Sequence, residues 1–188
     1  MFGNCKRGFT LIELMVTLAI IGILMGVMIP TFNRLLPRRQ RKVFVSSLNA
    51  LTRYAWQHAL VERKIHKLSF DFEKNLIWVE MATGVTKDGV PETTRVKGAY
   101  TSTSLSIPKN ILIKNFIIEG FDEMARYGAG RKGTAESWFY IMPDGLTQTV
   151  TINFIDTKEL NAAGKPRQFG FVLNPFTAQF KLYDSFQK

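Results

Sequence analysis

The stretch KRGFTLIELMVTLAIIGILMGVMIP, residues 6–30, decides how this chain begins. From Phe9 onward it is apolar apart from two threonines, two glycines and a single charged residue, Glu13. A helix from Phe9 to Ile29 would reach about 31 Å at roughly 1.5 Å per residue, which matches the hydrocarbon core of a bilayer. The sequence therefore predicts a transmembrane helix over residues 9–30.

Glu13 is the anomaly in this segment, because a carboxylate within a span costs a few kcal/mol and by default has a partner or a function. No Lys, Arg or His lies between Gly8 and Arg34. A neutralising cation on the same helix is therefore absent, unless cleavage before Phe9 creates a new amino group there. The alternative is a shallow glutamate that reaches the lipid headgroups.

The position of Gly8 distinguishes this segment from a conventional secretory signal. In such a signal the small residues of the cleavage site follow the apolar stretch, whereas Gly8 precedes it. Cleavage at Gly8 would leave the apolar helix on the mature protein.

The string from Lys6 to Leu14 resembles the class III signal of type IV pilins and of type II secretion pseudopilins. The resemblance implies that a prepilin peptidase removes residues 1–8 as a leader peptide, cleaving between Gly8 and Phe9, and methylates the new amino group of Phe9. It also implies that Phe9 and Glu13 act in filament assembly, with the Glu13 carboxylate meeting the methylated amino terminus of a neighbouring subunit. Pro30 falls where these proteins commonly carry a helix-distorting proline.

The basic residues on either side of the span give conflicting indications of orientation. Only Lys6 and Arg7 precede it, and five cations follow it, so the positive-inside rule alone predicts an outside amino terminus. The resemblance implies the opposite, because the peptidase of that family works from the cytoplasmic side. We expect a single-pass protein of the bacterial inner membrane with its C-terminal domain in the periplasm. The following cluster is expected to be a solvated or headgroup-contacting helix face: Arg34, Arg38, Arg39, Arg41 and Lys42.

Residues 31–64 are predicted to continue as an amphipathic helix. Apolar or small side chains recur every three or four residues at Phe44, Leu48, Leu51, Ala55 and Ala59, which marks one face of a helix that carries a sheet. The expected end lies near residues 63 and 64, where basic side chains suit a helix carboxyl terminus.

Residues 65–188 are predicted to form an antiparallel β-sheet domain. Alternating or continuous apolar runs indicate strands near residues 68–72, 76–79, 111–118, 138–142, 147–155, 169–173 and 179–183. Residues 82–100 are expected to be a long loop or a weakly paired excursion. The fold class is α+β: a pilin-like lollipop whose long N-terminal helix has a transmembrane first half and packs on the sheet.

Four further strings resemble the minor pseudopilin H group, also called the GspH/FimT type: residues 48–51 continuing through Ala55 and Ala59, and residues 68–71, 139–145 and 169–173. The chain has no C-terminal cysteine pair of the kind that many pilus-type relatives carry. This departure favours secretion over pilus function.

Composition and spacing give little indication of chemistry. Cys5 is the single cysteine, His58 and His66 have no further ligands at metal-site spacing, and no carboxylate pair or phosphate-binding loop stands out. We predict neither catalysis nor a cofactor; an anchored enzyme would need a converging polar pocket. Lys and Arg number 25 against 15 Asp and Glu, and the net charge of +10 favours phosphate, anionic lipid or acidic protein surfaces.

Two functions from different classes follow. The first is a minor pseudopilin of a type II secretion system that assembles into or caps the inner-membrane pseudopilus. Its partners would be the prepilin peptidase, other pilin or pseudopilin subunits, inner-membrane lipid and secreted cargo. The alternative is a minor type IV pilin, similar to FimT-like relatives associated with DNA uptake, whose basic loop with Arg126, Arg131 and Lys132 contacts DNA.

Overall fold

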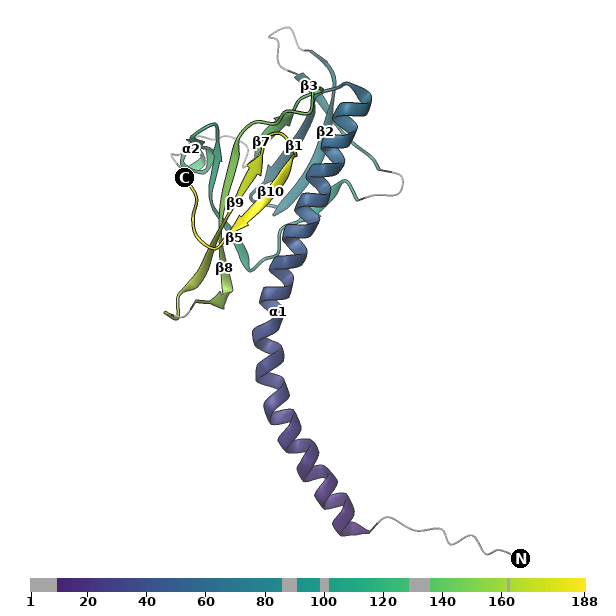
Figure 1. Ribbon diagram of the computed structural model, residues 1–188, viewed down its shortest axis with the longest axis vertical. Coiled ribbons are helices and arrows are strands. Elements are labelled where there is room, and N and C mark those ends of the chain that lie inside the picture. The colour runs from purple at the N-terminus through teal and green to yellow at the C-terminus, as the bar shows by residue number, and fades with distance from the viewer. Residues whose placement is uncertain (1–9, 86–90, 99–101, 129–135, 162) are drawn as a thin grey trace, which may run out of the picture. The chain divides into compact units, whose positions relative to one another are not determined.

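The computed structural model describes residues 10–85, 91–98, 102–128, 136–161 and 163–188, without the side chains at positions 27, 29–37, 85 and 126–128. The chain divides into two compact units, residues 1–38 and 39–188. Helix α1 begins in the first unit and ends in the second (Figure 1).

Helix α1, Leu11–Glu62, is one element that continues through Pro30 and Pro37 without a break. It ends close to the predicted position because Arg63 adopts a left-handed conformation, with φ of 53°, which stops the helical hydrogen-bond pattern. Among the residues that the structure describes, no helix has the combination of length and apolarity needed to cross a membrane.

The second unit contains two five-stranded antiparallel sheets. Sheet A has the order β3-β2-β1-β7, with β4 also paired to β2; its strands are β1 (His66–Asp71), β2 (Leu76–Val85), β3 (Pro91–Arg95), β4 (Ser104–Ser106) and β7 (Glu136–Ile141). Sheet B has the order β10-β9-β8-β5-β6; its strands are β5 (Ile111–Ile118), β6 (Phe121–Asp122), β8 (Val150–Leu160), β9 (Pro166–Asn174) and β10 (Gln179–Tyr183). The short helix α2, Glu123–Gly128, follows β6.

The fold is the predicted one, an N-terminal helix packed on antiparallel sheet, with local corrections. Each predicted strand is present, and β5 and β10 have the predicted bounds. For residues 82–100 the second predicted alternative, a paired excursion, is present in the described part, because β2 extends to Val85 and pairs with β3. Strands β4 and β6 and helix α2 were not predicted, because they are too short to show a periodic pattern.

The turn between β1 and β2 follows from one buried carboxylate. Asp71 Oδ1 accepts hydrogen bonds from the backbone N–H of Glu73 and of Lys74, at 3.0 and 2.8 Å, and Asn75 closes the turn with φ of 53°. Burial alone would raise the pKa of Asp71, but the hydrogen bonds and charge of Lys74, with the Glu73 N–H, outweigh burial and lower the pKa. The predicted hairpin is thus held by a side chain from the end of β1.

The predicted helix face forms the centre of the core. All five of its residues are buried, and they belong to one hydrophobic cluster with the inner faces of both sheets: Phe44, Leu48, Leu51, Ala55 and Ala59. Aromatic rings join the layers, with centroids 4.8 Å apart for Phe70 and Phe116 and 5.8 Å apart for Phe44 and Phe154. One core therefore joins α1 to both sheets.

Arg41 corrects the expectation of a wholly solvated basic face. Arg38, Arg39 and Lys42 are exposed, but Arg41 is only 4% exposed. Its Nη1 lies 3.2 Å from Glu159 Oε2, and its guanidinium carbon is 5.5 Å from the ring centre of Phe169. Arg41 precedes Phe44 by three residues and so shares the face of α1 that packs on the sheet.

The outer strand of sheet B is covered by a side chain of α1. Asn49 Nδ2 donates to the backbone oxygen of Phe180 at 3.1 Å, and the Phe180 N–H donates to Asn49 Oδ1 at 2.6 Å. The amide of Asn49 therefore satisfies both backbone groups that Phe180 presents at the edge of β10, as a neighbouring strand would.

A second amide fixes the C-terminal segment. Asn153 Nδ2 donates to the backbone oxygen of Gln187 at 2.8 Å, and Asn153 Oδ1 accepts from the Gln187 N–H at 2.9 Å. Gly170 makes room for this pairing, since a Cβ there would lie 2.9 Å from Asn153 Oδ1, Gln187 Cγ and the Ser185 oxygen. Larger residues at position 170 would displace the end of the chain.

His66 makes the stability of the second unit depend on pH. Its side chain is fully buried, Nδ1 lies 3.1 Å from the Lys64 oxygen, and Nε2 has no hydrogen-bond partner among the described residues. Burial lowers the pKa of His66 below its ordinary value of 6.5 because the charged ring is poorly solvated. The contribution of the neutral His66 ring to the free energy of unfolding is therefore complete above pH 6.5. It is lost as the pH falls from 6.5 toward the pKa of the folded state, because in this range the unfolded chain binds a proton that the folded chain does not.

We expect the unfolding temperature of the full chain in neutral detergent to fall between pH 7 and pH 5. The His66 contribution to the slope approaches about 1.4 kcal/mol per pH unit. His66→Gln, which retains a side-chain donor, should reduce the slope. Equal slopes for wild type and His66→Gln, from thermal unfolding followed by circular dichroism, would contradict this assignment.

Candidate assembly site at the start of the helix

Thr10 caps the amino terminus of α1. Its backbone oxygen accepts from the N–H groups of Glu13 and Leu14, at 3.1 and 3.2 Å, and its Oγ1 lies 3.4 Å from the Glu13 nitrogen. Thr10 thus occupies the N-cap and Glu13 the third helical position, which is the spacing of a capping box. The pattern Thr10-x-x-Glu13 is present in the sequence and is the signal from which this cap could have been predicted.

Glu13 lies in the first turn of α1 with an exposed side chain. A carboxylate at this position is favoured by the positive end of the helix dipole, which contributes about 0.3–1 kcal/mol. The capping box assigns Glu13 a role within its own helix, and its exposure leaves the carboxylate accessible to a cation from outside. These two roles are compatible. The capping position also suits a glutamine, whereas the dipole contribution and pairing with a cation from outside both require the negative charge.

The turns that follow present apolar side chains all round the helix. The large apolar side chains described between Leu11 and Met28 are 47–78% exposed in the isolated chain. A helix that is apolar on every side is buried in its working environment, because so much exposed hydrocarbon is unfavourable in water. Such a surface therefore calls for an apolar covering.

The remaining predicted site residues lie mostly outside the described part. Gly8 and Phe9 precede it, and Arg131 and Lys132 fall in the gap before β7. Pro30 belongs to the helical run of α1, and its distorting role stays a prediction. The backbone of Arg126 lies in α2, but its side chain is not described.

No metal-binding cluster of three or more His, Cys, Asp or Glu side chains occurs within the described ranges. His58 Nδ1 lies 2.7 Å from Glu62 Oε1, and the rings of His58 and His66 are 6.3 Å apart. These contacts belong to the junction of α1 and β1 and bring together no further ligand.

Comparisons with known proteins agree with this geometry. Residues 3–29 match the family model described as the prokaryotic N-terminal methylation motif. Fimbrial protein Q of Moraxella bovis is 42% identical over 65 residues, which are 35% of this chain. The chain spans 41% of the length of that relative.

Two solved structures of the minor pseudopilin EpsH, from the type 2 secretion system of Vibrio cholerae, resemble the fold. One has a TM-score of 0.50 at 10% sequence identity, and the matched region covers 80% of this chain and 97% of the EpsH chain. The other has a TM-score of 0.47 at 9% identity and covers 76% and 95%.

The amino-terminal segment thus carries the prokaryotic N-terminal methylation motif at the start of a capped apolar helix. The fold, a helix packed on antiparallel sheet, resembles that of a minor pseudopilin.

Proposed function

We propose that this protein is a minor pseudopilin of a type II secretion system, assembling into or capping the inner-membrane pseudopilus that drives protein export. Before assembly, a prepilin peptidase cleaves between Gly8 and Phe9 and methylates the new amino group. Residues 9–30 anchor the chain in the inner membrane, and the two-sheet unit lies in the periplasm.

The capped start of α1 carries the proposal. Three properties meet there: the methylation motif over residues 3–29, the exposed Glu13 carboxylate in the first turn, and the apolar surface that follows. Before assembly, lipid covers the apolar side chains of α1. In the filament, neighbouring helices cover them. In that setting the methylated ammonium of Phe9 on one subunit neutralises Glu13 of the next.

Processing provides the direct test. Coexpression of the full chain with a prepilin peptidase is expected to remove Met1–Gly8 and to leave a methylated Phe9, as read by intact mass and amino-terminal sequencing. Gly8→Leu, which places a bulky side chain before the scissile bond, is expected to block cleavage. An unprocessed wild-type chain, under conditions where a control prepilin is cut, would overturn the proposal.

A minor type IV pilin is the second candidate, and the identity with a fimbrial protein of Moraxella bovis favours it. In that reading the full chain in neutral detergent binds duplex DNA, and affinity falls steeply with salt. Replacing Arg131 and Lys132 by alanine should weaken binding, whereas replacing Arg38 and Arg39, an equal loss of charge, should not. Secretion and DNA uptake, measured in a deletion strain complemented with each variant, separate the two candidates.

A further inference from the structure

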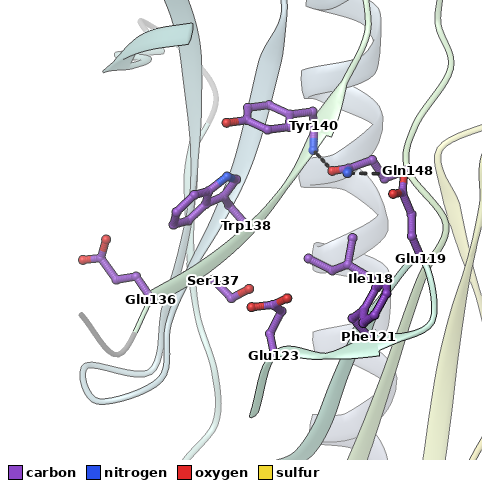
Figure 2. Close-up of a pocket in the computed structure, with 9 residues that line it drawn as sticks. All are labelled: Ile118, Glu119, Phe121, Glu123, Glu136, Ser137, Trp138, Tyr140 and Gln148. Atoms are coloured by element: carbon purple, nitrogen blue, oxygen red, sulfur yellow. Dashed lines mark hydrogen bonds between the residues drawn. The ribbon is translucent and has the colours of Figure 1, made fainter. Parts of the chain in front are cut away.

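A groove of about 450 Å³ lies beside the outer strand of sheet A (Figure 2). Trp138 and Tyr140 of β7 line one side, and Ile118 and Phe121 at the β5–β6 turn line the other. Ser137 lies between them (Figure 2). The groove thus has a strand edge along one wall and an exposed aromatic ring on the other.

The wall opposite β7 is held in place by local hydrogen bonds. Glu119 and Gly120 have φ of 50° and 87°, which make the two-residue turn that joins β5 to β6. Asp122 Oδ1 accepts from the N–H groups of Phe116 and Met124 at 3.1 and 3.0 Å. Phe121, which is 69% exposed, is therefore presented on a fixed frame.

The backbone of β7 faces this groove. Tyr140 N–H donates to Gln148 Oε1 at 2.9 Å, and the Tyr140 oxygen accepts from the Gln148 N–H at 3.4 Å, so the backbone of Tyr140 points away from β1. Backbone groups alternate along a strand, so the N–H and C=O of Trp138 point the same way. No described residue pairs with them. This part of the edge can accept another strand.

Among the described residues, the lining of the groove is acidic. It includes Glu119, Glu123 and Glu136, and none of the described lining residues is Lys or Arg. Trp138 is 39% exposed, and its ring already lies 4.5 Å from Lys67 Nζ, so the indole stands where it interacts with cations. A carboxylate-lined groove with aromatic rings is complementary to an arginine or lysine side chain.

We propose that this groove binds an extended, positively charged segment of another protein, which adds as a strand to β7. Backbone hydrogen bonds to Trp138 hold the segment, and its cationic side chains lie among the carboxylates and the aromatic rings. This inference concerns a surface of the second unit and does not depend on the processing of the amino terminus.

The test uses the full chain in neutral-detergent micelles with a fluorescent peptide of alternating Thr and Arg, Ac-Thr-Arg-Thr-Arg-Thr-Arg-Thr-NH2. Thr favours the extended conformation, and alternation places the Arg side chains on one face. Fluorescence anisotropy at low salt is expected to show saturable binding despite the positive charge of the protein. The same peptide with Glu in place of Arg should not bind, and methylation of alternate backbone nitrogens should abolish binding.

Two double variants locate the contact. Glu119→Gln with Glu136→Gln should weaken binding roughly five- to tenfold. Glu62→Gln with Glu92→Gln removes the same charge elsewhere on the unit and should leave the affinity unchanged. Circular dichroism verifies that both variants remain folded.

Several results would overturn the proposal. They are absence of saturable binding by the folded wild-type chain, equal affinity for the backbone-methylated peptide, and equal loss of affinity in the two double variants. Self-association of the chain would also overturn the proposal if Phe121→Ser removed it and the equally exposed control Phe176→Ser did not. That result would assign the groove to a second copy of the chain.

Discussion

Glu13→Ala is expected to leave membrane insertion and cleavage intact and to remove the chain from assembled filaments. In the proposed filament the Glu13 carboxylate meets the methylated ammonium of a neighbouring Phe9 in apolar surroundings. Removing one partner leaves a buried charge uncompensated, at a cost of about 3–5 kcal/mol. That is roughly two to four orders of magnitude in subunit incorporation. Incorporation is measured by crosslinking of sheared filaments and by secretion in a complemented deletion strain.

Glu13→Gln separates the two roles of this residue. Glutamine is also suited to the third position of a capping box, so the Thr10 cap and the start of α1 should persist. The charge is lost while the size is retained, and this variant should fail in assembly as Glu13→Ala does. Normal incorporation of Glu13→Gln would show that Glu13 acts through its helix rather than by pairing between subunits.

Asn49→Leu is expected to lower the free energy of unfolding by about 2–4 kcal/mol. The N–H and C=O of Phe180 would lose their partners at an edge that α1 covers, and each unsatisfied buried group costs about 1–3 kcal/mol. Urea unfolding of the full chain in neutral detergent gives the change in free energy. Hydrogen exchange of the Phe180 amide reports the edge itself and should accelerate.

Two variants define the specificity of this effect. Asn49→Asp retains the acceptor for the Phe180 N–H but places an oxygen opposite the Phe180 oxygen, so it should also destabilise the fold. Gln57→Leu, at an exposed position of the same helix, should change stability by less than about 0.5 kcal/mol. Unchanged exchange of the Phe180 amide in Asn49→Leu would contradict the edge-covering role of Asn49.

The helices and strands that could be predicted from the sequence are those stabilised by residues close together in the chain. The three- and four-residue spacing from Phe44 to Ala59 predicted the buried face of α1, and all of its residues are in the core. The β1–β2 hairpin followed from alternation and a turn whose donors and acceptors lie within five residues. The three-residue β4 could not be predicted, because it is fixed by pairing with β2. Helix α2 has a local cap in Asp122, but its six residues are too few to show a periodic pattern.

The same distinction between local and distant residues applies to the candidate site and to the groove. Gly8, Phe9 and Glu13 were nominated by a contiguous motif, and the capping box of Thr10 was visible in the same string. The groove beside β7 had no such signature. Glu119 and Trp138 are separated along the chain, and they line one groove only because β7 and the β5–β6 turn are placed beside each other.

By itself the sequence determined the apolar start with its single carboxylate, the amphipathic face of α1 and the positions of the longer strands. These depend on residues a few positions apart, so their pattern can be recognised without knowledge of any distant contact. Tertiary structure alone decided that the strands form two sheets, that Arg41 is buried against Glu159, that Asn49 covers the edge of β10 and that an acidic groove lies beside β7. Each of these outcomes joins residues far apart in the chain, and which of them meet is settled by how the whole core closes.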